Sequence, residues 1–370
     1  MFNTLRTGLK PYCFLLTLIF GTQFGHRSIL FAQSGRVQLD SHYGYVLPEY
    51  SNLQYLINKP ATGFSAAYIK PTSGKSYWER LYAYPSFGIA AFYSGLGNDS
   101  INGRELAIYP FMRIRIAGND KFNLYNQFGL GFSYISHKFE LENNYLNITT
   151  GSHLNLHFGM RFGTEIRIIP KIALTTGLSF DHFSNGNSME PNLGLNTFAA
   201  FAGLAYSFGK SDPKVIPELP VLVKKNRPEL SLRIGGKRAR ALVAEYFRTA
   251  SLSFEYIRNT FHMVHFGVGA DVFYDASTQA EMEAASAGLY KPLYDFQSGV
   301  HFSQSIIYNR FSFTLQEGVY IGLKYRVKNR PIYTRGMLRY RLNDNLAFSF
   351  AMKSHLHVLD FPEIGFGYRW

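Results

Sequence analysis

The chain has 370 residues and a formal net charge of +13, with 46% hydrophobic, 16% aromatic and only 17% charged residues. Few charges, many aromatic residues and 33 glycines indicate a protein that faces lipid on one side and packs its backbone tightly on the other. Beyond the N-terminal segment the sequence lacks any apolar run of the roughly 18 residues that a membrane helix needs, which excludes a helical membrane bundle.

Residues 1–32 are predicted to be a signal peptide. Arg6 and Lys10 give it a positive start, and residues 12–20 form an apolar core that is too short to span a bilayer. A short membrane anchor is the alternative interpretation. The only cysteine, Cys13, lies in this segment, so the mature chain is expected to have no disulfide, no thiol nucleophile and no cysteine-based metal site.

The excess of positive charge needs a partner that an exported protein can meet. An exported chain rarely meets nucleic acid, so we expect no nucleic-acid partner. Lipid A carries phosphates, so lipopolysaccharide in the surrounding leaflet would match a basic protein. A basic barrel lumen without any ligand explains the charge equally well.

Alternation of apolar with polar or small residues runs through most of the mature chain and predicts strands. This pattern suits a barrel strand with one face in lipid. A soluble sandwich also alternates, but it would not normally point Gly, Arg and His together at its core. The clearest example has Leu154, Leu156, Phe158, Met160 and Phe162 on one face and Asn155, His157, Gly159, Arg161 and Gly163 on the other.

Residues 34–209 are expected to form one barrel of eight strands that ends on Leu204, Tyr206 and Phe208. An aromatic end to the last strand is typical of outer-membrane barrels. The strand-like segments centre on Val37–Tyr45, Gly63–Lys70, Trp78–Ser94, Glu105–Ile116, Phe122–Lys138, Leu154–Ile168, Ile172–Ser184 and Thr197–Phe208.

Residues 210–229 contain four prolines, whose density forbids a paired strand and predicts an extended linker. Residues 230–370 again give about eight strand-like segments, interrupted by an Ala-rich stretch at 275–290 that is expected to be partly helical, and close on the aromatic Trp370. The sequence therefore predicts an all-β transmembrane protein of two tandem eight-stranded barrels. One larger barrel of about sixteen strands is the alternative.

One polar stretch, residues 181–196, interrupts this pattern at the end of a strand. His182 and Ser184 continue the parity of the lipid-facing residues before them, and Asn192 and Asn196 share the parity of the lipid face on the next strand. Lipid offers polar side chains no partner, so four such residues on the outer wall need a reason. A polar hairpin in water at the rim of the barrel is the alternative interpretation.

The residue types in this stretch suit acyl transfer. Ser184 can act as a nucleophile if His182 takes its proton, and two positions along one strand face separate their Cα atoms by roughly 6–7 Å. The candidates for stabilising the oxyanion are the Asn185 side chain and the backbone N–H groups of Gly186 or Asn187. This chemistry requires neither a metal nor a cofactor.

The segment His182-Phe183-Ser184-Asn185, followed by Pro191-Asn192 and a glycine two residues later, resembles the signature of the outer-membrane lipid A 3-O-deacylase family. Residues 84–89 and 106–111 are also similar to that family, and the likeness covers about residues 63–209. The resemblance implies an eight-stranded barrel with a serine–histidine–acid site on its outer wall, which removes the ester-linked 3-hydroxyacyl chain at position 3 of lipid A. It also implies His182 as base, Ser184 as nucleophile, Asn185 as oxyanion donor and Asn192 as a supporting residue.

The acid of that site is where this chain departs from the family. The family's glutamate falls at Asn196, which can orient an imidazole but cannot stabilise an imidazolium by charge. Glu190, on the intervening loop, is a possible substitute. We therefore expect a lipid A esterase in the outer membrane, and a non-enzymatic barrel that binds lipid or a protein partner is the alternative. A small channel is a third possibility, which requires the single larger barrel.

The second half carries a distorted version of the same pattern at His355 and His357, with Glu363 following. These histidines fall on the lumen face together with Lys353. A zinc site is one interpretation, but a polar network in the lumen is favoured, and the second barrel is expected to be non-catalytic.

Overall fold

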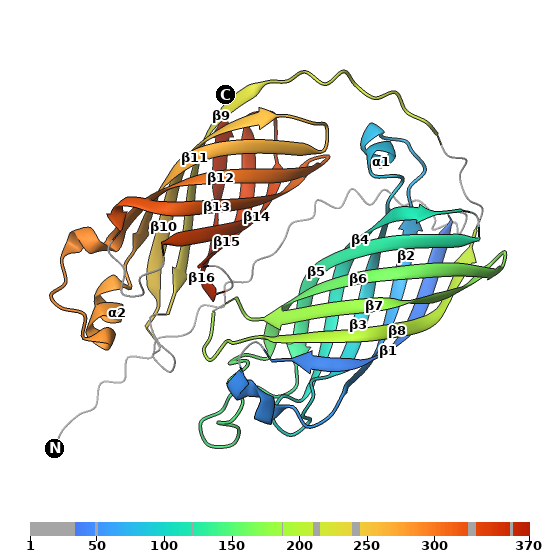
Figure 1. Cartoon of the computed structure of the whole chain (residues 1–370), viewed down its shortest axis with the longest axis horizontal. Helices are drawn as coiled ribbons and strands as arrows, with labels where there is room; N and C mark the ends of the chain where they lie inside the picture. The colour runs from blue at the N-terminus through green and yellow to red at the C-terminus, as the bar shows by residue number, and fades with distance from the viewer. Residues whose placement is uncertain are drawn as a thin grey trace, which may run out of the picture.

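The computed structural model describes residues 34–48, 51–119, 121–186, 188–209, 215–238, 245–324, 331–355 and 358–370. The expected signal peptide, residues 1–32, lies outside them. Within this part of the chain, the strands form two closed antiparallel barrels of eight strands each (Figure 1). The prediction of two barrels is thus confirmed, and the alternative of one barrel with about sixteen strands is wrong.

In the first barrel each strand pairs with the next along the chain, and β8 closes the sheet against β1. A 3-10 helix, η1 (Ser51–Leu56), follows β1, and a short helix, α1 (Tyr77–Leu81), precedes β3. The strands are β1 (Gly35–Leu47), β2 (Ala61–Pro71), β3 (Ser86–Gly95), β4 (Arg104–Gly118), β5 (Phe122–Ile135), β6 (Leu154–Ile169), β7 (Ile172–Ser184) and β8 (Leu195–Phe208).

The second barrel repeats this up-and-down order, with β16 closing against β9. The Ala-rich stretch between β11 and β12 contains α2 (Thr278–Ala285) and η2 (Pro292–Asp295), so its helical prediction is confirmed. The strands are β9 (Asn226–Lys237), β10 (Phe247–Asn259), β11 (Val264–Asp275), β12 (Phe296–Tyr308), β13 (Phe311–Lys324), β14 (Ile332–Arg341), β15 (Leu346–His355) and β16 (Val358–Arg369).

The segment expected as one strand over Trp78–Ser94 is only half strand, because β3 begins at Ser86. The Glu79 carboxylate accepts hydrogen bonds from the backbone N–H groups of Gly74 and Lys75 and fixes a turn around α1. Ala83 and Tyr84 then adopt positive φ angles of 54° and 59°, which end the helix before the strand starts. The local contacts of the Glu79 carboxylate therefore decide the structure of this segment, although its alternating pattern predicts a strand.

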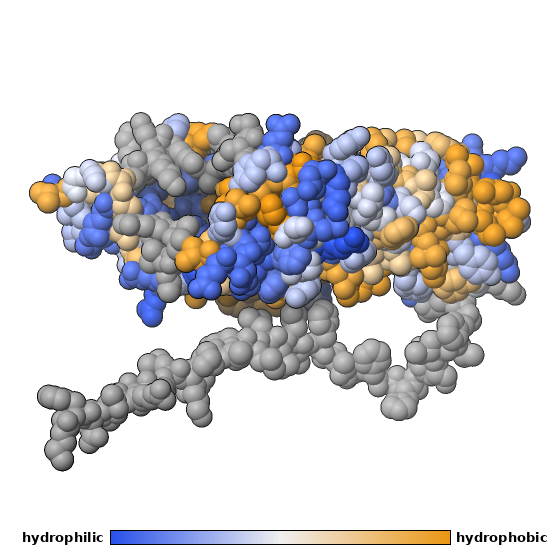
Figure 2. All heavy atoms as spheres, turned by 90° about the horizontal axis from the view of Figure 1, so that it is seen from below, coloured by the Kyte–Doolittle hydropathy of each residue, from blue (hydrophilic) through white to orange (hydrophobic). Residues whose placement is uncertain are grey.

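Polar and charged residues fill the interior of both barrels, and many of the charged ones form ion pairs. In the first barrel Arg161 lies 2.8 Å from Asp181, and in the second Arg335 lies 2.8 Å from Glu363. Pairing is what makes burial of such charges tolerable. The opposite faces of the strands are apolar and exposed, and the view in Figure 2 shows a broad apolar area on the surface. Neither helix in the described part of the chain is long and apolar enough to cross a bilayer.

The two ends of each barrel differ in the length of their connections. One end, here called the short-turn end, has the connections 119–121 and 170–171 in the first barrel and 309–310 in the second. The other, the long-loop end, has 136–153 and 185–194 in the first barrel and 276–295 in the second. The first helix lies at the short-turn end of its barrel.

The two barrels touch through the α1 region. Trp78 packs edge-on against Tyr308 of β12, with ring centroids 4.6 Å apart. The Tyr82 hydroxyl donates a hydrogen bond of 2.7 Å to the backbone carbonyl oxygen of Ile307. Burial raises the pKa of Tyr82 to about 12, so the hydroxyl keeps its proton at neutral pH.

Candidate active site on the outer wall

His182 and Ser184 lie at the end of β7, on the lipid-facing side of the strand. In the antiparallel register His182 stands opposite Phe158 of β6 and Asn196 of β8, and Ser184 stands opposite Leu156. The flanking residue Phe183 points into the barrel and is fully buried. The parity argument from the sequence thus places both polar side chains where the structure has them.

The three polar side chains form a connected hydrogen-bonded row. The His182 Nε2 atom lies 3.2 Å from the Ser184 Oγ atom, and the His182 Nδ1 atom lies 2.7 Å from the Asn196 Oδ1 atom. An amide oxygen can only accept, so Nδ1 carries the proton and Nε2 is left as the acceptor for the serine hydroxyl. All three residues are half-buried. This arrangement meets the geometric requirement for a serine nucleophile activated by an oriented base.

Asn196 occupies the position that an acid takes in a serine–histidine–acid site. Its backbone position directly opposite His182 makes it a cross-strand neighbour, which is why so short a side chain can reach the imidazole. Glu190, the other candidate, lies on the connecting loop, where its peptide bond to Pro191 is cis.

The loop after Ser184 is held together by its asparagines. The Asn192 Oδ1 atom accepts a hydrogen bond of 2.9 Å from the Asn185 backbone N–H group. The Asn185 Nδ2 atom donates to the Met189 backbone oxygen at 2.6 Å. Asn185, which the sequence predicted as an oxyanion donor, braces this turn with its side chain in the structure.

Gly186 is the better-placed candidate for oxyanion stabilisation. It is buried, has a φ angle of +64°, and its backbone N–H group has no protein acceptor among the described residues. Buried N–H groups are normally paired, so a free one beside a nucleophile is available for a developing negative charge. Asn187, the neighbouring candidate, lies outside the described residues.

Gly194 is a site residue that the sequence argument did not single out. Its φ angle is +68°, and a Cβ atom at this position would lie 3.2 Å from His182 Cε1 and 3.4 Å from Ser184 Cβ. Its N–H group donates a hydrogen bond of 2.9 Å to the Thr149 backbone oxygen. The only signal in the sequence was its place after Pro191-Asn192 in the family-like pattern.

The proposed zinc alternative in the second barrel finds no support. The His355 Nε2 atom lies 2.9 Å from the Tyr320 hydroxyl, and Glu363 is paired with Arg335. His357 lies outside the described residues. Across the part of the chain that the structure describes, no cluster of three or more His, Cys, Asp or Glu side chains could hold a metal ion.

Comparison with known proteins yields two family matches, one on each barrel. The model "Lipid A 3-O-deacylase (PagL)" matches residues 62–205, and "Acyloxyacyl hydrolase, C-terminal domain" matches residues 226–370. No curated protein matches the chain.

Several solved structures resemble parts of the chain. Neisserial surface protein A is 13% identical and covers 47% of this chain and 97% of its own, with a TM-score of 0.32. The outer membrane enzyme PagL is 15% identical and covers 45% of this chain and 97% of its own, with a TM-score of 0.30. A Rh. blastica porin mutant is 10% identical and covers 91% of this chain and 98% of its own, with a TM-score of 0.17.

Proposed function

Because the chain belongs to the lipid A 3-O-deacylase (PagL) family, we propose that it removes an ester-linked 3-hydroxyacyl chain from lipid A by a Ser184–His182 mechanism. The family matches support an outer-membrane lipid A deacylase. One observation carries the finer proposal, namely that the imidazole of His182 touches the Ser184 hydroxyl on one side and Asn196 on the other.

The geometry supports a two-step acyl transfer. His182 Nε2 takes the proton of the Ser184 hydroxyl as its Oγ atom attacks the acyl carbonyl carbon. We assign the Gly186 N–H group as the donor to the resulting oxyanion. When the tetrahedral intermediate collapses, the ester C–O bond breaks, and the sugar hydroxyl leaves with the proton from His182. Water, deprotonated by the same imidazole, then attacks the acyl-serine, and the fatty acid is released.

Asn196 sets the orientation of the base without adding charge. Its amide oxygen fixes the tautomer with the proton on Nδ1, which is the tautomer that lets Nε2 act as a base. It cannot stabilise the imidazolium that forms during attack. We therefore propose a working but slow hydrolase, in which an acid at position 196 would be faster.

The position of the site suits a lipid substrate. Short turns face the periplasm and long loops face the exterior in outer-membrane barrels, so the long-loop end lies at the outer leaflet, where lipid A resides. Leu156 and Phe158 flank His182 and Ser184, here called the dyad, on the lipid-facing wall. They offer an acyl chain an apolar surface. Export by residues 1–32, acting as a signal peptide, completes this proposal.

The second barrel lacks the equivalent chemistry. The prediction of a linker over 210–229 and a second barrel over 230–370 is wrong at their boundary, because β9 begins at Asn226 and Pro228 is paired with Tyr256 there. The last two lipid-facing residues of β15, the strand that corresponds to β7, are Met352 and Ser354. Met352 stands opposite Pro362, whereas His182 stands opposite Asn196. A thioether cannot take a proton from a serine, and proline has no side-chain acceptor. We infer that the first barrel, residues 34–209, does the catalysis alone.

Lipid A mass spectrometry on cells that express the full chain tests the proposal. Wild-type protein should give lipid A that lacks one hydroxyacyl chain, and Ser184→Ala should leave lipid A intact. Ser41→Ala, which removes an exposed hydroxyl from the lipid face of β1 away from the dyad, serves as the matched control and should deacylate normally. Unchanged lipid A with folded wild-type protein in the membrane would favour the alternative, a barrel that binds lipid without hydrolysis, for which Asn196 is the motivating observation.

A further inference from the structure

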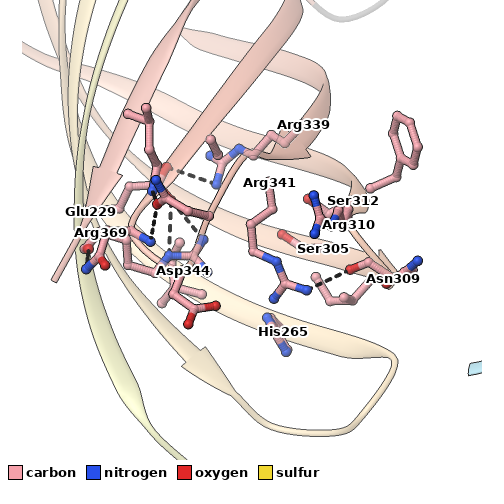
Figure 3. Close-up of a pocket in the computed structure, with 17 residues that line it drawn as sticks. Glu229, His265, Ser305, Asn309, Arg310, Ser312, Arg339, Arg341, Asp344 and Arg369 are labelled. Carbon is pink, nitrogen blue, oxygen red and sulfur yellow. Dashed lines mark hydrogen bonds and ion pairs between the residues drawn. The ribbon is translucent and has the colours of Figure 1, made fainter. Parts of the chain in front are cut away.

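A small cavity opens at the short-turn end of the second barrel, far from the dyad in both sequence and barrel position. It has a volume of about 50 Å³ and is lined by arginines from separate elements (Figure 3). Arg310 comes from the β12–β13 turn, Arg339 and Arg341 from β14, and Arg369 from β16. We call this group of four the arginine mouth.

The cations of the arginine mouth outnumber its carboxylates. Only two acids line the cavity, Glu229 and Asp344. Glu229 is shared between Arg339 at 3.1 Å and Arg369 at 2.8 Å, so it has no further charge to offer. Arg339 also contacts a deeper acid, Glu255, at 3.0 Å, so Arg339 and Arg369 both have a carboxylate partner.

Arg310 and Arg341 are the cations left over. Neither forms an ion pair with any residue in the described part of the chain, and both are exposed. The Arg341 guanidinium donates a hydrogen bond of 3.2 Å to the backbone carbonyl oxygen of Asn309. Figure 3 shows Arg341 reaching toward Asn309, with the His265 ring beside it. Two guanidinium groups that line one cavity, with no carboxylate of the described residues within ion-pair distance of either, are stabilised by an anion that binds between them.

More positive charge surrounds the same opening. Lys224, Lys225 and Arg227 lie immediately before or at the start of β9, whose first residues are at the short-turn end. These side chains raise the local positive potential and draw anions toward the cavity. Ser305 and Ser312 add neutral hydroxyl donors to its lining.

We propose that the arginine mouth binds a single phosphate group. Guanidinium groups form paired hydrogen bonds with the oxygens of a phosphate, and two unpaired guanidinium groups match its double negative charge. A volume of about 50 Å³ accommodates one such group and excludes a nucleotide or a sugar ring. The phosphate is either free in the periplasm or part of a phospholipid headgroup in the inner leaflet, because short turns face that side.

Calorimetric titration of the purified full chain in a maltoside detergent tests this site with two probes, inorganic phosphate and the short-chain lipid dihexanoyl phosphatidylglycerol. The test variants are Arg310→Gln, in an exposed turn, and the double variant Arg310→Gln with Arg341→Gln. The matched control is Arg258→Gln, an exposed arginine on the outer face of β10 that does not line the cavity. Thermal unfolding of each variant in detergent reports whether the second barrel is folded.

Wild-type protein should bind at least one probe at a ratio of one to one. Arg310→Gln should weaken binding roughly tenfold, the double variant should weaken it more, and Arg258→Gln should change it less than about twofold. Binding of inorganic phosphate identifies a free-ion site, and binding of the lipid alone identifies a headgroup site. Absence of saturable binding to the wild type, equal binding by the double variant, or an equal loss in Arg258→Gln overturns the proposal.

Discussion

The same place in the two barrels carries different chemistry. At the long-loop end of the first barrel, the lipid face ends in an imidazole and a hydroxyl, with an amide across the strand. At the matching place in the second, the lipid face ends in Met352 and Ser354, with Pro362 across the strand. Both barrels use one fold, so the fold itself does not create the site.

The two barrels differ in where their polar residues lie. The second barrel has paired charges in its interior, in contacts such as Arg335 with Asp271 and Glu363. The first barrel has a similar interior, around His157 and Asp181, but it also places a polar row on the wall that faces hydrocarbon. A polar group in lipid is costly unless it is paired. The three side chains of this row form hydrogen bonds with one another, and the same hydrogen bonds make the serine reactive.

Among the variants that test this difference between the barrels, removing the base should have the largest effect on the rate of deacylation. His182→Ala is expected to lower the rate of lipid A deacylation by roughly 10⁴–10⁶-fold, because the serine hydroxyl loses its proton acceptor. A double variant with Ser184→Ala should be no slower than either single variant, since the two residues act as one unit. The measurement is the rate of acyl release from purified lipid A. His153→Ala, a half-buried histidine near the long-loop end, is the control and should keep the wild-type rate.

Changing Asn196 should have the next largest effect, and its direction depends on the substitute. Asn196→Leu removes the acceptor for His182 Nδ1, so the same assay should show a loss of roughly 10²–10⁴-fold. Asn196→Asp keeps the size of the side chain and adds charge, so it should speed turnover roughly tenfold or more. A wild-type rate in Asn196→Leu would show that another group orients the imidazole.

A methyl group at Gly194 should have a smaller effect. Gly194→Ala puts a Cβ atom 3.2 Å from His182 Cε1 and strains a backbone with φ of +68°. Displacement of the imidazole should cost roughly 10–100-fold in rate. Gly288→Ala provides the control, because its φ is +90° and a Cβ atom there meets nothing within 4 Å. A wild-type rate in Gly194→Ala would show that the contact with His182 does not matter.

Breaking an ion pair in the second barrel should have the smallest effect on the reaction. Glu229→Gln leaves Arg339 and Arg369 without their shared carboxylate, which should destabilise that barrel by about 3–5 kcal/mol. Deacylation should stay within about twofold of the wild type at temperatures where the protein is folded. Thermal unfolding in detergent and the acyl-release assay give the two readouts. A large loss of rate without unfolding would mean that the second barrel takes part in the reaction.

Strand parity allowed much of this structure to be predicted from the sequence. The period of two in β6 and β7 placed His182 and Ser184 on the outer wall, and the prolines separated the two barrels. Parity also identified Asn196 as their neighbour, because antiparallel register fixes which residues face each other.

The loops were beyond the reach of that argument. The turn after Ser184 has no periodicity, so the direction of the Asn185 side chain and the contact of Gly194 with His182 depend on hydrogen bonds between distant segments, such as that to Thr149. The helix α1 was missed for a similar reason, because a carboxylate contact from Glu79 decides its turn. Contacts of this kind leave no regular spacing in a sequence.

Covalent labelling with a fluorophosphonate tests the central claim most directly, because only an activated serine hydroxyl displaces fluoride from phosphorus at a useful rate. Peptide mass spectrometry of the labelled full chain should find the phosphonyl group on Ser184 in the wild type and should find none in His182→Ala. Labelling of a different serine, or labelling of Ser184 that does not change when His182 is removed, would contradict the account.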